Sequence, residues 1–278
     1  MTAKHTLIAM TMIAAGILLA LVGYFSGGRW LIIKDEDGFH VPSNQQLVSQ
    51  SYTLDAFTKI DLRNDYGDLE IIAGGSDYKL ETKVLKQQDV TYRIDNGTLI
   101  IETAVRKKNS IEFGFGNFHS PSIKIHVPTD KELDTITINN SFGDIAIQQL
   151  HYQQLDLQQD YGDITFDRIM GDKTEISQSF GDITLQQYTS NGTTINSEHG
   201  DMDIDGTLHG PTTISSSFGD TTLSLQNKKS EIGYDLTTSF GDITINGEEQ
   251  RNNVTQLSDG DHQLTISSSN GDIELSLK

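Results

Sequence analysis

The amino-acid sequence predicts an all-β fold, a parallel β-solenoid (β-helix) of roughly 19-residue coils, preceded by one transmembrane helix. Three observations support this prediction. A Gly-Asp pair recurs at a spacing of 19 residues along the chain of 278 residues, apolar and polar positions alternate around each pair, and an uncharged apolar run lies near the N-terminus. A fixed period of about 20 residues is typical of a solenoid, in which a coil buries its apolar face only by stacking on its neighbours.

The Gly-Asp pairs mark one position in each coil. Some are 19 residues apart, two later ones are less regularly spaced, and one outlier lies upstream. In chain order, the pairs that follow this pattern are Gly67-Asp68, Gly143-Asp144, Gly162-Asp163, Gly181-Asp182, Gly200-Asp201, Gly219-Asp220, Gly241-Asp242 and Gly271-Asp272. Glycine accepts the positive φ of a tight corner, so each pair is expected to form the turn between two short strands.

Aliphatic side chains recur at fixed positions around each pair. The positions two and four residues after the glycine and five before it are almost all aliphatic, and they alternate with polar positions. The position seven before the glycine shrinks to threonine midway, through Ile136, Leu155, Thr174, Thr193, Thr212, Tyr234 and Leu264. We therefore expect stacked coils that form parallel sheets, with strands about 4.8 Å apart. The final coil ends at Lys278 without an evident cap, which predicts an exposed sheet edge there.

The chain is expected to divide into four segments. These are a cytoplasmic tail at residues 1–6, a transmembrane anchor at 7–25, a linker at 26–50 with a short strand at 30–34, and the β-solenoid domain at 51–278. Within the solenoid domain, the coils are expected to be irregular over residues 51–132 and regular over residues 133–278.

The expected anchor, residues 7–25, is uncharged and mostly apolar over 19 residues. As a helix it is about 28 Å long, close to the roughly 30 Å of a bilayer core. A cleaved signal peptide is the alternative, because the segment is N-terminal and follows Lys4. Since a short tail precedes it and an acidic chain follows, we expect a single-pass cell-membrane protein whose soluble domain is extracellular.

Charge and composition limit the classes of partner. The formal net charge of −19 argues against nucleic acid, because phosphate contacts need clustered lysine and arginine. The absence of cysteine excludes disulfides, thiolate metal sites and a cysteine nucleophile. Besides the membrane, the expected partners of this acidic chain are a cationic peptide, a basic protein or an envelope polymer.

Aspartates in the middle of the repeat are the candidate metal ligands. The segment HGDMDID places Asp201, Asp203 and Asp205 on one face of a strand, and neighbouring coils add Asp182 and Asp220. Such oxygen ligands suit Ca²⁺. The alternative is structural: the Asp carboxylate of each turn accepts main-chain N–H bonds, and the remaining carboxylates form a solvated acidic stripe.

A column of rings precedes the glycines. It consists of Phe142, Tyr161, Phe180, His199, Phe218 and Phe240. The column is open to two interpretations, packing at a solenoid corner or a platform on which sugars stack. We take His199 as a tolerated substitution within the column.

No catalytic arrangement is evident in the sequence. There is no GxSxG elbow and no HExxH motif, and no pair of carboxylates is distinguished from the many others. We therefore predict that the protein is not an enzyme, with no catalytic and no cofactor-binding residues.

The repeated [FY]GDI-x-[IL] units resemble the bacterial "putative adhesin" domain family of unknown function. They are joined by NDYGDLEI, NGTLII and IKIHVP further upstream, so the resemblance covers about residues 52–278. It implies a β-helical domain on the cell envelope, tied in some members to envelope-stress responses. The family offers no catalytic residues to carry over.

Three functions are consistent with the sequence. The first is a membrane-anchored, non-enzymatic surface module, adhesin-like or scaffolding, that binds envelope components or cationic partners. The second is a regulatory ectodomain of an envelope-stress system, and the third is a β-helical polysaccharide-active enzyme. For the third, Asp201, Asp203 and Asp205 are the residues to test.

Overall fold

The computed structural model describes residues 16, 30–35, 38–40, 47–85, 88–105, 111–115, 121–258 and 262–278. Apart from Gly16, the expected anchor at residues 7–25 lies outside this set. Within the described ranges, no helix is long and apolar enough to cross a membrane. The chain separates into two compact units, one made of Met1–Gln45 with Lys107–His119 and the other of Gln46–Arg106 with Ser120–Lys278.

The first unit contains a small antiparallel sheet. Its strands are β1 (Trp30–Asp35), β2 (Gly38–His40) and β9 (Ile111–Phe115), in the order β2-β1-β9. Strand β1 covers the short strand expected at residues 30–34. Its partner β9 comes from a part of the sequence for which no structure was predicted.

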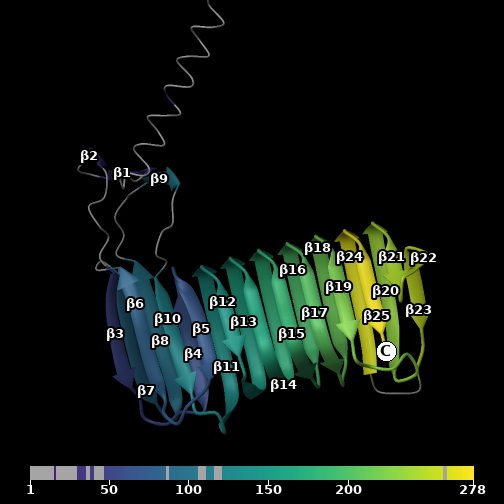
Figure 1. The fold of residues 1–278 in the computed structure, drawn as a ribbon, viewed down its shortest axis with the longest axis horizontal. Coiled ribbons are helices and arrows are strands. Elements are labelled where there is room, and N and C mark those ends of the chain that lie inside the picture. Colours follow the sequence, from purple (N-terminus) through teal and green to yellow (C-terminus); the bar gives the residue numbers. More distant parts are fainter. Residues whose placement is uncertain are drawn as a thin grey trace, which may run out of the picture. The chain divides into compact units, whose positions relative to one another are not determined.

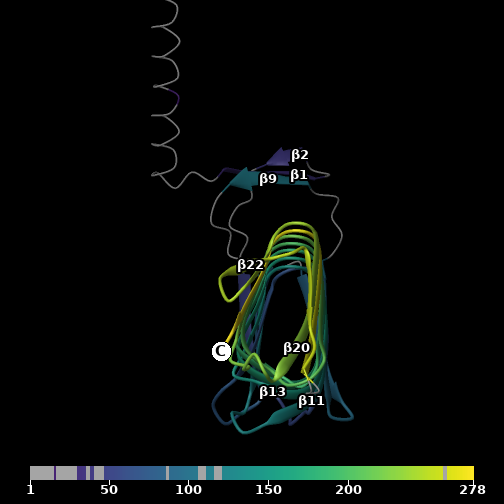
Figure 2. The same ribbon diagram turned by 90° about the vertical axis from the view of Figure 1, so that its right-hand side faces the viewer.

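The second unit is a solenoid-like stack of β-coils (Figure 1). Its strands are β3 (Leu47–Thr53), β4 (Lys59–Asn64), β5 (Asp68–Ala73), β6 (Lys79–Leu85), β7 (Gln88–Asp95), β8 (Thr98–Val105), β10 (Ser122–Val127), β11 (Glu132–Phe142), β12 (Ile145–Gln148), β13 (His151–Tyr161), β14 (Ile164–Phe180), β15 (Ile183–Ser190), β16 (Thr193–His199), β17 (Met202–Leu208), β18 (Thr212–Phe218), β19 (Thr221–Leu225), β20 (Ile232–Phe240), β21 (Ile243–Ile245), β22 (Glu248–Gln250), β23 (Asn253–Gln256), β24 (His262–Asn270) and β25 (Ile273–Leu277). Seen along the stack, two walls of strands face each other and meet at narrow turns (Figure 2).

The 19-residue period sets the register between coils. Ile145 pairs with Ile164 in parallel, and Ile164 pairs with Ile183, so equivalent residues lie directly above one another. The inward aliphatic side chains of these strands are almost completely buried and form one core. The predicted alternation, parallel pairing and period are therefore confirmed for the coils from Gly143 to Gly219.

The glycines of the Gly-Asp pairs are required by the stacking as well as by the turn. Gly181 has φ +135°, and a Cβ placed on it would lie 2.0 Å from the carbonyl oxygen of Gly162. At Gly200 the corresponding distance to the Gly181 oxygen is 1.8 Å. No side chain fits where one corner rests on the main chain of the next.

Thr174 and Thr193, which replace larger aliphatic residues in the repeat, contact two buried tyrosines. The Tyr188 hydroxyl donates to Thr174 Oγ1 at 2.7 Å and is 2.9 Å from Thr193 Oγ1. The Tyr152 hydroxyl lies 2.8 Å from the same Thr174 oxygen. Burial raises the pKa of Tyr152 well above its usual value and also raises that of Tyr188.

The upstream outlier Gly67-Asp68 belongs to the same stack. Strand β4 pairs in parallel with β11, and β5 pairs in parallel with β12, although 76 residues separate Asp68 from Asp144. The sequence between Asp68 and Asp144 also contains β8 and β10. Strand β8 pairs in parallel with β4, and β10 pairs in parallel with β5, on the side away from β11 and β12. Strands β7, β6 and β3 then close this end of the stack in antiparallel pairings.

The prediction that the C-terminal coil forms an uncapped end of the stack is wrong. Strands β24 and β25 lie between two earlier coils, because β24 pairs in parallel with both β18 and β20, and β25 pairs with both β19 and β21. The outermost coil is therefore β20–β21, and β23 and β22 cover its edges in antiparallel pairing. The segment before Lys278 thus lies inside the stack, not at an uncapped edge.

Candidate functional site: a ridge of rings and carboxylates

The aspartates of the turns form a hydrogen-bonded ladder between coils. The main-chain N–H of Asp163 donates to Asp144 Oδ1 at 2.9 Å, and that of Asp182 donates to Asp163 Oδ1 at the same distance. Equivalent bonds join Asp68, Asp144, Asp163, Asp182, Asp201, Asp220, Asp272 and Asp242, in that order. The expected main-chain bonds thus exist, but each carboxylate accepts from the next coil rather than within its own turn.

Only one oxygen of each mid-ladder carboxylate is used in this way. Among the described residues, no hydrogen bond reaches Oδ2 of Asp163, Asp182 or Asp201, and all three side chains are exposed. The ladder therefore combines a structural role for one oxygen with a row of free negative charge in water. Such a row attracts cations along its length.

The five candidate metal ligands separate into two places. Asp182, Asp201 and Asp220 are consecutive members of the ladder, whereas Asp203 and Asp205 are exposed on β17 and point away from the core. Asp203 pairs in register with Thr184 and Thr222. No group of three or more His, Cys, Asp or Glu side chains suited to a metal ion occurs within the described part of the chain. The calcium site stays a prediction.

The aromatic column stands beside the ladder as a stack of exposed rings. Centroids are 4.9 Å apart between Phe142 and Tyr161, 5.1 Å between Tyr161 and Phe180, 4.6 Å between Phe180 and His199, and 5.0 Å between His199 and Phe218. Neighbouring rings are within 10° of parallel. Their exposed fractions nevertheless reach 41–50% for the four large hydrophobic members.

The stack presents ring edges to water, because each inner ring has a neighbour on both faces. Stacking of a sugar or a cation on an aromatic side chain uses the ring face. The geometry therefore favours apolar contact along the edges over a platform for sugars. Asn270 occupies the next place after Phe218 and separates Phe240 from the stack, since β24 pairs with both β18 and β20.

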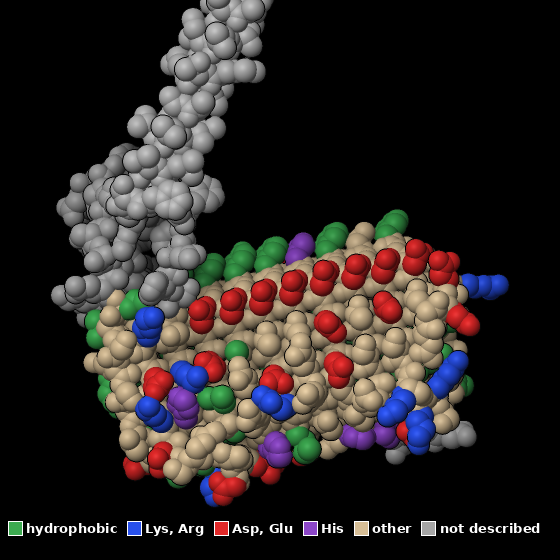
Figure 3. Space-filling model, in the orientation of Figure 1, with side chains coloured by type: hydrophobic (Ala, Val, Ile, Leu, Met, Phe, Trp, Pro, Cys, Tyr) green, Lys and Arg blue, Asp and Glu red, His purple; other side chains and the backbone are tan. Residues whose placement is uncertain are grey.

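We call the rings Phe142, Tyr161, Phe180, His199 and Phe218, together with the adjoining carboxylates Asp144, Asp163, Asp182, Asp201 and Asp220, the ridge. Figure 3 shows the two rows side by side, acidic side chains running parallel to hydrophobic ones with a histidine among them. Each ring is two residues before its aspartate, so the turn fixes their offset in every coil. The ridge is an amphipathic strip with an axial repeat of about 5 Å.

A buried polar column below the turns holds the ridge in place. Asn140 Nδ2 donates to the Gly143 carbonyl oxygen at 2.9 Å, and Gln159 Nε2 donates to the same oxygen at 2.8 Å. Gln178 Nε2 donates to the Gly162 oxygen at 2.6 Å. These bonds satisfy carbonyl groups that point into the stack at the first corners of the ridge, whereas the buried hydroxyls of Ser197 and Ser216, at the same place in later coils, have no partner among the described residues.

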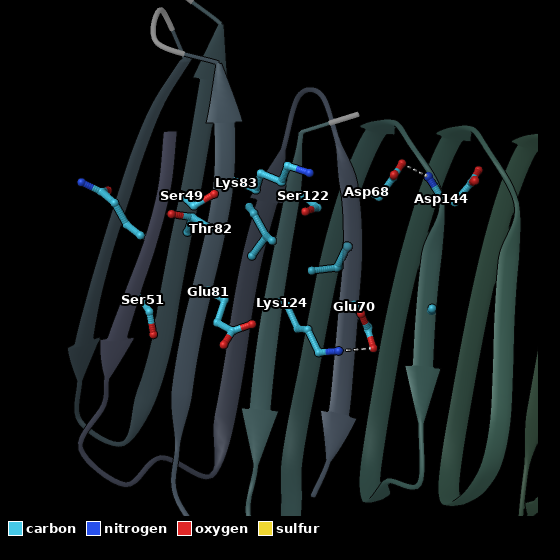
Figure 4. A pocket seen from close by; sticks show the side chains of 14 residues that line it. Ser49, Ser51, Asp68, Glu70, Glu81, Thr82, Lys83, Ser122, Lys124 and Asp144 are labelled. Carbon is cyan, nitrogen blue, oxygen red and sulfur yellow. Dashed lines mark hydrogen bonds and ion pairs between the residues drawn. The ribbon is translucent and has the colours of Figure 1, made fainter. Parts of the chain in front are cut away.

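A second feature lies over the first coils, outside the sequence-predicted sites. It is a hollow of about 600 Å³ on the outer face of strands β3, β6, β10, β5 and β12 (Figure 4). Its charges come from Asp68, Glu70, Glu81, Lys83, Lys124 and Asp144. Sequence reasoning did not find it, because its strands come from segments without the repeat and pair in an order unlike that of the chain.

Asp68 belongs to both the ladder and the hollow. Its carboxylate starts the ladder and also lines the hollow. Desolvation by partial burial, aided by the negative charge of Asp144, raises the pKa of Asp68, although the hydrogen bond from the Asp144 N–H opposes this. Negative charge is therefore less favourable at Asp68 than it would be in water, and a cation placed beside it would relieve this.

A family model described as Toastrack DUF4097 matches residues 57–207 and 175–276, which together are most of the chain. The chain belongs to the Toastrack DUF4097 family. This membership confirms the resemblance carried by the repeated FGDI units. No curated protein matches the chain.

Solved structures that match the chain include three of bacterial origin. One from Bacteroides fragilis, described as a putative adhesin, is 15% identical with a TM-score of 0.48 and covers 85% of this chain and 99% of its own. One from Clostridium sporogenes, a putative cell adhesion protein, is 13% identical with a TM-score of 0.39, covering 84% and 100%. One from Parabacteroides distasonis, a putative lipid binding protein, is 13% identical with a TM-score of 0.37, covering 84% and 98%. Similarity at this level says nothing about what this chain binds.

Proposed function

We propose that the solenoid domain is a non-enzymatic binding module on the outer side of a cell membrane, adhesin-like or scaffolding in its role. The apolar segment at residues 7–25 supports this location, because its length and composition suit a single membrane anchor. The partners we propose are cationic peptides, basic proteins or cation-bearing envelope polymers, bound along the ridge.

The exposed ring stack is the observation that carries this proposal. Phe142, Tyr161, Phe180 and Phe218 each expose 41–50% of their surface in one continuous row. Scattered exposed apolar side chains are normal, but a continuous row that water would not favour marks an interaction surface. The corners below it pack directly on one another, as at Gly181 and Gly200, so little order has to be gained on binding.

The carboxylate row decides the kind of partner. Asp163, Asp182 and Asp201 place free oxygens beside the rings at every coil, and the chain as a whole has a net charge of −19. A partner that carries both apolar groups and cations can contact both rows at once. Binding should therefore weaken as salt screens the charges, with a Debye length of about 10 Å at 0.1 M.

Binding to a cationic amphipathic peptide of lysine and leucine tests the proposal, with octalysine as the purely cationic counterpart. We expect the amphipathic peptide to bind more tightly than octalysine, and both to weaken between low and high ionic strength. The variant Tyr161→Ser/Phe180→Ser should bind the amphipathic peptide at least tenfold more weakly. Its control is Met170→Ser/Leu257→Ser, which removes two apolar side chains outside the ridge that are more exposed than Tyr161 and Phe180.

Equal binding by the ridge variant and the control variant would contradict the proposal. So would an affinity for octalysine that does not change with ionic strength. Both variants alter exposed side chains, so their folding is checked by circular dichroism before binding is compared.

A further inference from the structure

The hollow over the first coils exists because small side chains stand between large ones. Ser49 and Ser51 on β3, Ser122 on β10 and Ala146 on β12 form low points in the outer face of the sheet. Larger lysine and glutamate side chains from β5, β6 and β10 surround them (Figure 4). Its volume of about 600 Å³ is within the range of small-molecule sites.

One row of charges across the hollow is internally neutralised. Lys124 Nζ lies 2.7 Å from Glu70 Oε1, and Lys79 pairs with Glu81. His126 Nε2 is also 3.5 Å from Glu81 Oε2. These pairs neutralise the carboxylates of Glu70 and Glu81, so a ligand would gain little binding energy from contact with either glutamate.

The neighbouring row has opposite charges that are not joined. Ser122 is in register with Lys83 on one side and with Asp68 on the other, and Lys83 is in register with Ser49. Within the described part of the chain, Lys83 forms no ion pair and no side-chain hydrogen bond. In Figure 4 its side chain extends over β10 on the side where Ser122 and Asp68 lie.

We infer that the hollow binds a zwitterionic phospho-amine, with its phosphate at Lys83, Ser49 and Ser122 and its amine at Asp68 and Asp144. Lysine is a common phosphate ligand as a point charge, and the two hydroxyls supply further donors for a group with several acceptor oxygens. Since Lys83 and Asp68 are one strand to either side of Ser122, their main chains are about 10 Å apart. The Lys83 and Asp68 side chains extend into this separation, and a phosphate and an amine joined by two carbons are the ligand length that we propose for it.

The lining disfavours other classes of small ligand. It contains no aromatic residue, so it lacks the ring faces on which sugars stack. A simple anion would meet Asp68 and Asp144, and a simple cation would meet Lys83. Only a ligand with both charges matches both ends, and the amine also offsets the unfavourable burial of the Asp68 carboxylate.

The test is calorimetric titration of the full chain, held in a maltoside detergent that carries neither phosphate nor amine. O-phosphoethanolamine should bind at least tenfold more tightly than inorganic phosphate or ethanolamine alone. Lys83→Gln should weaken this binding at least tenfold, whereas Lys59→Gln, which removes an exposed lysine outside the hollow, should leave it unchanged. Ser122→Tyr fills the hollow without a change of charge and should abolish binding.

Glycerophosphoethanolamine, the headgroup of a phospholipid, separates the two sources of such a ligand. Tighter binding of this diester indicates a lipid headgroup, and tighter binding of the monoester indicates a free phospho-amine; both outcomes support the site. The inference is overturned if phosphate or ethanolamine alone binds as tightly as the joined molecule. It is equally overturned if Lys83→Gln and Ser122→Tyr, shown to be folded by their melting curves, bind like the unaltered chain. The hollow shares Asp144 with the ridge, but Lys83→Gln and Ser122→Tyr alter only residues outside the ridge, so failure of this test leaves the proposed function standing.

Discussion

The main-chain N–H of Asp182 lies 2.9 Å from the carboxylate of Asp163, one coil earlier in the stack. This bond ties the turn of each coil to the turn of the next, while the second carboxylate oxygen faces water. The same aspartates therefore hold the coils in register and supply the negative row of the ridge. The two roles have opposite effects on stability: the hydrogen bonds stabilise the stack, whereas the carboxylates, about 5 Å apart, repel one another.

Replacement of a mid-ladder aspartate separates these two effects. Asp182→Ala removes the acceptor for the Asp201 N–H and should lower the free energy of unfolding by about 1.5–3 kcal/mol, the range for hydrogen bonds to charged groups. Asp182→Asn keeps an acceptor oxygen and removes a repelling charge, so its loss should be less than half as large. Urea denaturation at low salt measures both. Equal losses for the two variants would show that the hydrogen bond is not what matters.

Addition of a methyl group at the corner should be far more damaging than elsewhere. Gly181→Ala places a Cβ 2.0 Å from the Gly162 oxygen at a φ of +135°, so we expect a loss of about 3 kcal/mol or more. Gly74→Ala is the matched control, since its Cβ would meet nothing within 4 Å. Thermal unfolding compares them, and similar melting temperatures would contradict the close contact between corners.

The buried tyrosines predict a loss of stability at alkaline pH. Burial raises the pKa of Tyr152 and Tyr188 above their unfolded value of about 10, so the folded state retains phenolic protons that the unfolded state releases. Their contribution is complete below pH 10 and is lost as pH rises through the folded pKa. Tyr188→Phe gives up bonds to Thr174 and Thr193 and should cost about 1–3 kcal/mol at pH 7.

The alkaline part of this loss should be smaller in Tyr188→Phe than in the unaltered chain, because one of the tyrosines whose pKa burial raises is absent. The measurement is the free energy of unfolding from pH 8 to pH 11. An identical pH profile for both proteins would show that Tyr188 titrates normally.

The internal position of the C-terminal coil predicts an unusual response to truncation. Deletion of residues 262–278 removes β24 and β25, which separate β18–β19 from β20–β21. It should therefore abolish cooperative unfolding of the coils beyond β19, whereas loss of a true end coil would leave the rest of the stack intact. Limited proteolysis followed by mass spectrometry shows which segments stay protected. Full protection of residues 232–245 in the truncated chain would contradict the observed strand order.

Repetition made most of the fold predictable. A 19-residue spacing together with alternating aliphatic positions defines the coil, the turn and the inward faces, and neighbouring coils in the sequence are neighbours in space from Gly143 to Gly219. The prediction failed where that adjacency ends. Nothing in the spacing of Gly241 and Gly271 indicates that the coil at Gly271 is stacked between the coils at Gly219 and Gly241.

The parts of the surface were predictable to different degrees. The rings and aspartates of the ridge form visible columns in the sequence, although their exposure and the contact between ring faces follow only from the structure. The narrowing of the aliphatic column to Thr174 is visible in the sequence, but its hydrogen bond from Tyr188 follows only from the structure. The hollow was hidden because Ser49, Lys83 and Ser122 meet through antiparallel pairings that no repeat encodes.

Photo-crosslinking tests the central claim, that the ridge is the binding surface, most directly. A lysine–leucine peptide with one photoreactive residue would be bound to the full chain, irradiated and mapped by mass spectrometry. The account predicts crosslinks concentrated at Phe142, Tyr161, Phe180 and Phe218 and the adjoining aspartates, and their loss in Tyr161→Ser/Phe180→Ser. Crosslinks spread over other faces and unchanged in that variant would contradict it.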